Sequence, residues 1–175
     1  MDPETTVARL RAAGCVFAED EARLLHGAGA EPAELESMVD RRVGGEPLEQ
    51  ILGWAWFHGR RIAVEPGVFV PRRRTELLVD LAAALARPGS VVVDLCCGSG
   101  AIGAAIADAA GAVELYAVDV DPAAVRCARR NLPPGAVVLQ GDLFEPLPPV
   151  VRHRVEVLAA NVPYVPSVAI ATMPP

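Results

Sequence analysis

The sequence predicts an α/β fold in which a parallel sheet, with helices on both faces, follows a small helical domain and a β-hairpin. Three observations lead to this fold class. Short helical segments fill the first fifty residues, apolar runs alternate with helical segments from residue 90 onward, and a glycine-rich loop joins the first run to its helix. Such alternation is typical of strands buried on both sides of a parallel sheet. The four apolar runs are residues 91–95, 113–118, 136–140 and 155–160.

Residues 1–44 are predicted to form a domain of three short helices. The first begins near Thr5 or Thr6, either of which can cap it, the second covers residues 18–26, and the third begins at Pro32. Helices this short are not stable alone, so we expect them to pack together or on another part of the chain.

Residues 45–74 are expected to link this domain to the next one. Alternating apolar side chains on both sides of Glu65-Pro66-Gly67 indicate a β-hairpin with its turn at these residues. Thr75 can cap the helix that follows. The last domain is then residues 75–175, which contain all four apolar runs.

The composition excludes several classes of protein. The 175 residues carry a net charge of −6, which disfavours binding to nucleic acid through phosphate charge. No charge-free apolar stretch is long enough to cross a membrane. The four cysteines form no C-x-x-C pair and the three histidines lie far from them, so no metal site is expected. With the acidic amino terminus, this cysteine usage favours a reduced, cytoplasmic setting.

The segment Asp94–Gly100 joins the first apolar run to the next helix. Its glycines allow the backbone to bend sharply and to approach a ligand closely, and the amides that begin the helix favour a negative group. Asp119 ends the second run, about twenty residues later, where its carboxylate can accept both hydroxyl hydrogens of a ribose. Loop and carboxylate together predict a nucleoside-binding site.

Two cofactors are compatible with this loop. Residues 98–103 match the G-x-G-x-x-G fingerprint of NAD-binding proteins. However, Asp94 can face the cationic end of S-adenosyl-L-methionine (AdoMet), and Asp142, after the third run, can meet an adenine amine. We therefore expect AdoMet. Its predicted binding residues are Asp94, Cys96, Cys97, Gly98, Ser99, Gly100, Asp119, Asp142, Leu143 and Asn161.

The segment Asn161-Val162-Pro163-Tyr164 follows the fourth run, at the edge where open α/β sheets bind ligands. The side-chain oxygen of Asn161 and the carbonyl of Val162 can each accept one N–H of a planar –NH₂ group, and Tyr164 can stack on its plane. These four residues are the candidate catalytic residues. The alternative is a proline-containing turn with a local asparagine hydrogen bond.

Taken in order, these motifs resemble the bacterial HemK/PrmC family, AdoMet-dependent methyltransferases that modify the glutamine of the Gly-Gly-Gln motif in peptide chain release factors. The resemblance implies a class I methyltransferase Rossmann-like sheet, N5-methylation of a protein glutamine, and a release factor as the partner that docks on residues 1–44. The segments that carry it are GEPLEQILG (45–53), PGVFVPRRRTELLV (66–79), VVVDLCCGSGAIG, AVDVDPAAV, QGDLFEPL and NVPYVP.

The chain departs from the family pattern at three places. Val162 stands where the family has proline, Arg73-Arg74 where it has Pro-Glu, and Cys96 where it has glycine. The family sheet has seven strands and four are predicted here. We therefore expect a C-terminally truncated piece that is poorly soluble or oligomeric, because the last apolar strand is left at an edge.

Three alternatives stay open at this point. An N6-adenine nucleic-acid methyltransferase acts on a similar –NH₂ group, although the acidic composition disfavours it. An inactive remnant would bind AdoMet, or only a partner, without transferring a methyl group. An NAD-dependent oxidoreductase would be distinguished by nicotinamide cofactor binding.

Overall fold

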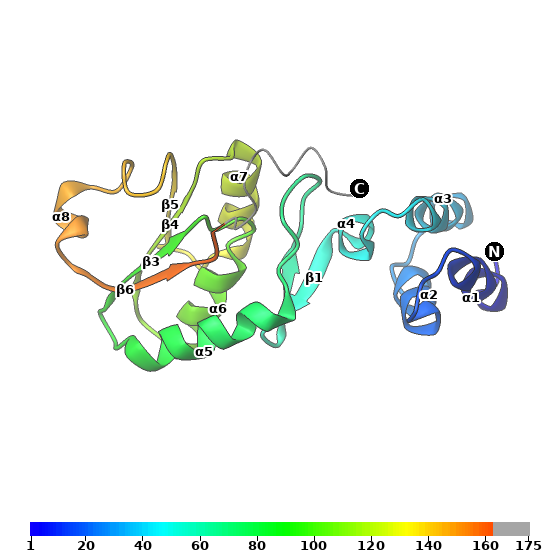
Figure 1. Ribbon diagram of the computed structural model, residues 1–175, viewed down its shortest axis with the longest axis horizontal. Helices are drawn as coiled ribbons and strands as arrows, with labels where there is room; N and C mark the ends of the chain where they lie inside the picture. Colours follow the sequence, from blue (N-terminus) through cyan, green and yellow to red (C-terminus); the bar gives the residue numbers. More distant parts are fainter. Residues whose placement is uncertain (163–175) are drawn as a thin grey trace. The chain divides into compact units, whose positions relative to one another are not determined.

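The computed structural model describes residues 1–162, whose contacts divide into two units (Figure 1). The first unit is Met1–Gly53 and the second begins at Trp54. The residues expected to act as a linker are therefore shared between the units, with a short helix in the first and the β-hairpin in the second.

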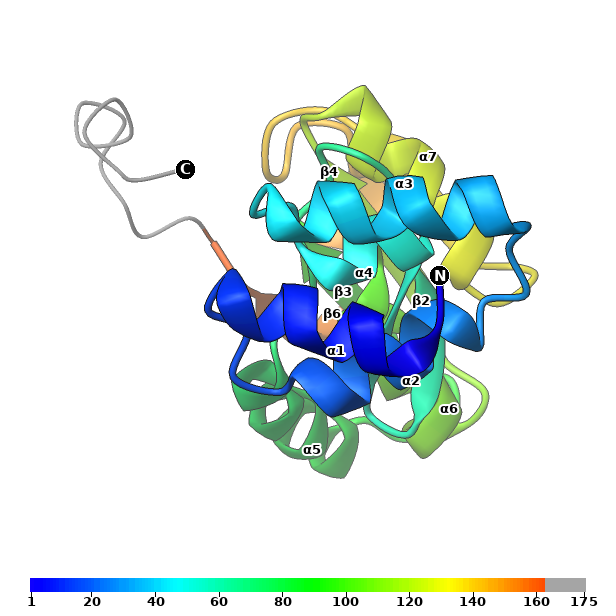
Figure 2. The same ribbon diagram turned by 90° about the vertical axis from the view of Figure 1, so that its right-hand side faces the viewer.

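Four helices form the first unit (Figure 2). The predicted helices are confirmed, but the N-cap of the first is Asp2, whose carboxylate accepts a hydrogen bond from the backbone N–H of Thr5 at 2.9 Å. The core contains fully buried Leu10, Leu25 and Val39. The helices are α1 (Pro3–Ala12), α2 (Ala18–His26), α3 (Pro32–Val43) and α4 (Leu48–Leu52).

Charge is unevenly divided between the two parts of the chain. Residues 1–53 contain eleven Asp or Glu and five Arg, whereas residues 54–175 contain eleven of each class. The whole net charge of −6 therefore belongs to the first unit. Within it, Arg42 and Glu21 form the least exposed ion pair, with side chains 21% and 13% exposed.

The second unit opens with an antiparallel hairpin of β1 (Trp54–Phe57) and β2 (Arg60–Ala63). The predicted turn at residues 65–67 is wrong. The hairpin turns at His58-Gly59, where both residues have positive φ, as a two-residue hairpin turn requires. Residues 65–68 form a separate turn, and the buried valines beyond it belong to an irregular segment rather than a strand.

A parallel sheet with strand order β5-β4-β3-β6 lies at the centre of the second unit (Figure 1). The four predicted strands are confirmed, and they are β3 (Val91–Leu95), β4 (Glu114–Asp119), β5 (Val137–Gln140) and β6 (Val155–Ala160). Leu95 pairs with Val118 on one side and Ala160 on the other. The loops that leave the carboxyl ends of all four strands therefore begin at one edge of the sheet.

Helices cover both faces of this sheet, as predicted. On one face, Val92 and Leu115 pack with helices α5 and α6, and helix α7 packs on the neighbouring strand residue Ala117 through Ala128. On the opposite face, Val91 and Val93 pack with helix α8. The helices are α5 (Glu76–Leu85), α6 (Ala101–Ala110), α7 (Pro122–Asn131) and α8 (Pro149–Arg152), and a 3₁₀ turn, η1 (Arg73–Thr75), precedes α5. Thr75 occupies the N-cap position of α5, but its side chain makes no capping hydrogen bond. The predicted fold class is confirmed.

Candidate functional site

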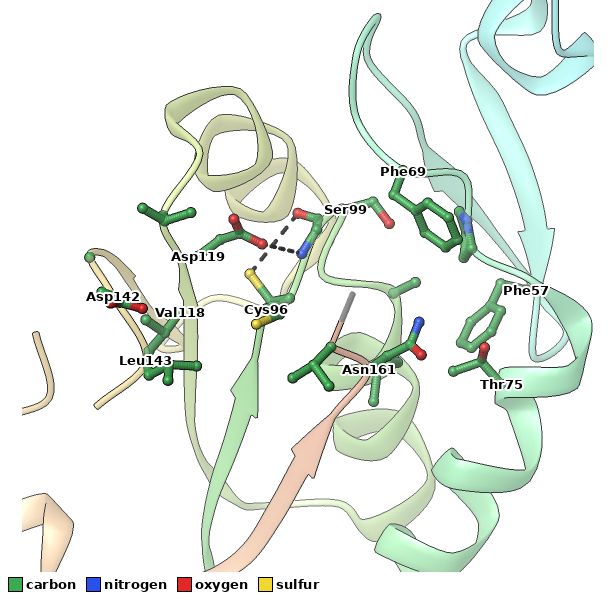
Figure 3. Close-up of a pocket in the computed structure, with 18 residues that line it drawn as sticks. Phe57, Phe69, Thr75, Cys96, Ser99, Val118, Asp119, Asp142, Leu143 and Asn161 are labelled. Carbon is green, nitrogen blue, oxygen red and sulfur yellow. Dashed lines mark hydrogen bonds between the residues drawn. The ribbon is translucent and has the colours of Figure 1, made fainter. Parts of the chain in front are cut away.

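A cavity of about 420 Å³ lies at the carboxyl edge of the sheet (Figure 3). Its volume is within the range of small-molecule sites, about 300–1,000 Å³. The loops after β3, β4, β5 and β6 contribute to it, together with the hairpin and the segment before α5. The sheet order thus brings together the glycine loop, Asp119, Asp142 and Asn161, which are far apart in sequence.

The loop after β3 turns through three residues with positive φ: Cys96 at 53°, Gly98 at 53° and Gly100 at 75°. A cysteine in this region is strained, since side chains other than glycine rarely adopt it. Asp119 holds the loop, because its Oδ2 accepts the N–H of Gly98 at 2.8 Å. Its Oδ1 accepts the N–H of Asp121 at 3.0 Å, and each oxygen keeps a further lone pair for a ligand.

Asp94 lies beneath this loop and is fully buried. Its Oδ2 accepts the N–H of Gly103 at 2.9 Å, while Oδ1 has no partner among the described residues. Burial raises the pKa of Asp94 from 3.8 to about 7, against the lowering effect of the Gly103 N–H and with a further increase from nearby Asp119. Asp94 is not among the residues that line the cavity, and its role in binding AdoMet stays a prediction.

Two thiols, those of Cys96 and Cys97, line the cavity beside Asp119. Burial, reinforced by the neighbouring carboxylates, raises the pKa of both thiols. Both are therefore weak nucleophiles near neutral pH. Their positions favour a role in shaping the wall of the cavity.

The polar lining is acidic. Asp119 and Asp142 contribute carboxylates, and no basic side chain belongs to the lining within residues 1–162. Leu143, next to Asp142, has a positive φ of 43° and also lines the cavity. A cavity with this charge favours a cationic ligand over a pyrophosphate-containing one.

Asn161 lies toward the other end of the cavity, near the labelled side chains of Phe57, Phe69 and Thr75 (Figure 3). It follows β6 directly and is partly buried, and Val162 beside it is 48% exposed. The other two candidate catalytic residues, Pro163 and Tyr164, lie outside the described residues.

The sequence interpretation missed the hairpin side of the cavity. Phe57 comes from β1, and Phe69, Pro71 and Thr75 come from the segment before α5. Phe57 belongs to no pattern that marks a ligand site. Phe69, Pro71 and Thr75 lie in the 66–79 segment that carries the family resemblance, but only the fold places them against the cavity. The divergent Arg72–Arg74 run lies between two of these lining residues and is exposed. Gly100, like Asp94, is not among the lining residues; it caps α6.

Residues 1–162 contain neither a cluster of metal-ligating side chains nor a membrane-spanning helix. No group of three or more His, Cys, Asp or Glu side chains in this range is arranged to hold a metal ion. No helix in the same range combines the length and apolar character needed to cross a membrane.

Comparison with known proteins gives a consistent result. Residues 60–168 match the family described as the methyltransferase small domain. The release factor glutamine methyltransferase of Corynebacterium glutamicum is 41% identical over 77% of this chain and 51% of its own length. The enzyme of the same name from Mycolicibacterium smegmatis is 35% identical over 93% of this chain and 65% of its own length.

A relative with a different substrate in its name also matches. The 4-amino-L-phenylalanine/4-methylamino-L-phenylalanine methyltransferase of Streptomyces pristinaespiralis is 37% identical over 79% of this chain and 50% of its own length. The chain spans about half the length of most of the curated relatives it matches. The resemblance to release factor methyltransferases that the motifs indicated is confirmed.

Proposed function

Because the chain belongs to the methyltransferase small domain family, we propose that it binds AdoMet in the cavity at the carboxyl edge of the sheet and serves methyl transfer to a planar amide nitrogen. The acceptor we propose is a protein glutamine, that of the Gly-Gly-Gln motif in a peptide chain release factor. The observation that carries the proposal is the cavity itself. The carboxylates of Asp119 and Asp142 lie at one end of this cavity, and Asn161 lies toward the other end. The described lining contains no basic side chain.

The residues present fit AdoMet. Asp119 lines the cavity, and each of its oxygens keeps a lone pair that a ribose hydroxyl can use; Asp142 with Leu143 offers a polar and an apolar contact for the adenine. The backbone of Gly98 can be approached closely, since a Cβ placed there would meet no atom within 4 Å. When bound, AdoMet supplies an electrophilic methyl group on a positively charged sulfur, and the acidic lining suits that charge.

The acceptor side rests on Asn161. Its side-chain oxygen can accept one N–H of the glutamine amide, and the carbonyl of Val162 can accept the other. These contacts would orient the nitrogen and stabilise the positive charge that develops on it as the new N–C bond forms and the bond between the methyl group and sulfur breaks; the nitrogen would then release one of its two protons to water. Positioning of this kind lowers the activation free energy by up to about 7–11 kcal/mol in well-oriented systems. Val162 keeps the carbonyl that the family's proline provides, but it lacks the fixed φ of a proline ring.

Release factor methylation is tested in two steps. Calorimetric titration with AdoMet, with NAD as the control ligand, first shows whether the cavity binds the expected cofactor. Purified release factor is then incubated with the protein and AdoMet, and a gain of one methyl group at the Gly-Gly-Gln glutamine is sought by mass spectrometry. Binding of NAD but not AdoMet would reject the proposal at the first step.

Asn161→Ala separates the two ends of the cavity. We expect this variant to lose methylation while keeping AdoMet affinity within a factor of about three, because the proposal gives Asn161 its main contact with the acceptor and only a minor one with AdoMet. Asp119→Ala is the matched variant for the opposite end and is expected to lose AdoMet binding. Equal loss of AdoMet binding in both variants would contradict the division of roles.

A second candidate acceptor is an aromatic amine. Phe57 and Phe69 line the same end of the cavity as Asn161, and one relative is named for methylation of 4-amino-L-phenylalanine. Assays with 4-amino-L-phenylalanine and with adenine-containing DNA, run beside the release factor, decide between these acceptors.

A further inference from the structure

The last turn of α7 lies directly against the glycine loop. A Cβ built on Gly100 would come within 3.0 Å of the Cβ of Ala128, and one built on Gly103 would come within 3.3 Å of Leu132 Cδ2. Such distances leave no room for a side chain. The loop and the start of α6 are therefore in close contact with this turn.

Asn131, the last residue of α7, adds polar contacts to the same junction. Its Nδ2 donates to the carbonyl oxygen of Ser99 at 2.8 Å and to that of Ala63 at 2.9 Å. Its Oδ1 accepts the N–H of Ala63 at 2.8 Å. Both amide hydrogens and the carbonyl oxygen are thus engaged. The reversed amide would direct an oxygen at two carbonyls, so this arrangement fixes the orientation of the side chain.

The glycine loop is held from two sides. Asp119 accepts the N–H of Gly98, and Asn131 donates to the carbonyl of the next residue, Ser99. Ser99 is buried and lines the cavity. Because three residues between 96 and 100 have positive φ, the loop lacks the repeating hydrogen bonds of a regular element. Side chains from neighbouring elements must therefore supply part of its order.

The other partner of Asn131 belongs to the opposite wall. Ala63 ends β2 and pairs with Trp54 of β1, the strand that also carries Phe57. Phe57 lines the cavity near Asn161 (Figure 3). One amide therefore joins the loop assigned to the cofactor with the hairpin assigned to the acceptor side.

We propose that Asn131 is a positioning residue that fixes the glycine loop relative to the hairpin and so sets the spacing of the two ends of the cavity. This inference rests on the proposed function, because the position of the glycine loop affects activity only if the loop binds AdoMet. Asn131 itself does not line the cavity and acts through Ser99 and Ala63.

The test compares Asn131→Asp and Asn131→Ala with a matched control. The aspartate keeps the shape but turns a donor into an acceptor that faces two carbonyls, whereas the alanine removes the contacts without adding repulsion. Arg130→Ala is the control: it removes the ion pair of Arg130 with Glu65, at 3.1 Å, which also joins α7 to the segment after β2 but does not touch the loop.

The first readout needs no ligand. In assigned spectra of protein labelled with ¹⁵N-glycine, we expect the amide signals of Gly98, Gly100 and Gly103 to shift or broaden in both Asn131 variants. Those of Gly14 and Gly29, in the first unit, should stay unchanged. The control should leave all five signals in place. Loop signals identical to those of the wild type in Asn131→Ala, or changes spread evenly over all glycines, would overturn the proposal.

The second readout is calorimetric titration with AdoMet. We expect the dissociation constant to rise at least tenfold in Asn131→Asp, less in Asn131→Ala, and by less than twofold in the Arg130→Ala control. Wild-type affinity in both Asn131 variants would overturn the proposal. Failure of the wild-type protein to bind AdoMet would instead reject the proposed function, and the glycine spectra would still decide whether Asn131 holds the loop. If Asn131→Asp does not fold, Asn131→Ala carries both readouts.

Discussion

Replacement of Asp94 by asparagine should change how the stability of the second unit depends on pH. The carboxyl is fully buried, one of its oxygens has no partner among the described residues, and burial raises its pKa from 3.8 to about 7. The folded state therefore keeps this proton over a pH range in which the unfolded state has released it. The contribution of the retained proton to the free energy of unfolding is therefore fully present below about pH 4, and it is lost as the pH rises through about 7.

The size of the effect follows from the two pKa values. One pKa unit corresponds to about 1.4 kcal/mol, so ionising Asp94 in place costs about 4 kcal/mol, of which about 3 kcal/mol falls between pH 5 and pH 8. In Asp94→Asn this contribution is absent. The stability of the wild type relative to the variant should therefore fall by about 3 kcal/mol between these two pH values.

Urea denaturation followed by tryptophan fluorescence measures this difference. Both tryptophans, Trp54 and Trp56, lie in the second unit, so the signal reports the unit that contains Asp94. Glu145→Gln, at an exposed carboxylate of the same unit, controls for the loss of one charge. Parallel stability curves for the wild type and Asp94→Asn from pH 5 to pH 8 would refute the reasoning.

Three further predictions concern stability. Cys96→Gly should stabilise the second unit by about 1 kcal/mol in urea denaturation, because glycine adopts the positive φ without strain; a loss of stability would contradict this. Gly103→Ala should destabilise it by about 1–2 kcal/mol, since the new methyl group lies 3.1 Å from a buried carboxylate oxygen and outweighs the gain in helix propensity. Arg42→Ala should cost the first unit about 1–3 kcal/mol by circular dichroism, because it leaves Glu21 largely buried and unpaired. The exposed Arg23→Ala should cost less than about 0.5 kcal/mol, and equal losses at the two positions would show that burial does not matter here.

The parallel sheet was predictable from sequence because its strands are apolar on both sides. Runs such as 91–95 stand out clearly from the helices between them. The strand order was not predicted, because the chain leaves β5 at one edge and returns past β4 and β3 before it forms β6 at the other edge, and no local pattern indicates this step. That Asp119, Asp142 and Asn161 line one cavity was predictable for the same reason, since each lies at or just after the end of such a strand and the ends meet at one edge.

The hairpin was placed wrongly because two turn signals compete in its sequence. Glu65-Pro66-Gly67 has the typical turn composition, but His58-Gly59 has the pair of positive φ angles that lets two strands continue with the right twist. The positive φ of His58 is not visible in the sequence. The same limit hid Phe57 and Asn131, whose roles depend on contacts between segments far apart in the sequence; Asn131, for example, contacts Ser99 and Ala63, which are 32 and 68 residues away.

The concentration of charge in the first unit has a consequence for the colloidal behaviour of the whole chain. Residues 54–175 have no net charge, so the repulsion that keeps copies apart near neutral pH comes from residues 1–53. The negative charge of the helical unit is therefore the source of electrostatic repulsion between neighbouring molecules. A fragment that begins at Trp54 should therefore self-associate near neutral pH, and high salt, which shortens the range of repulsion to a few ångströms, should bring the intact chain toward the same behaviour.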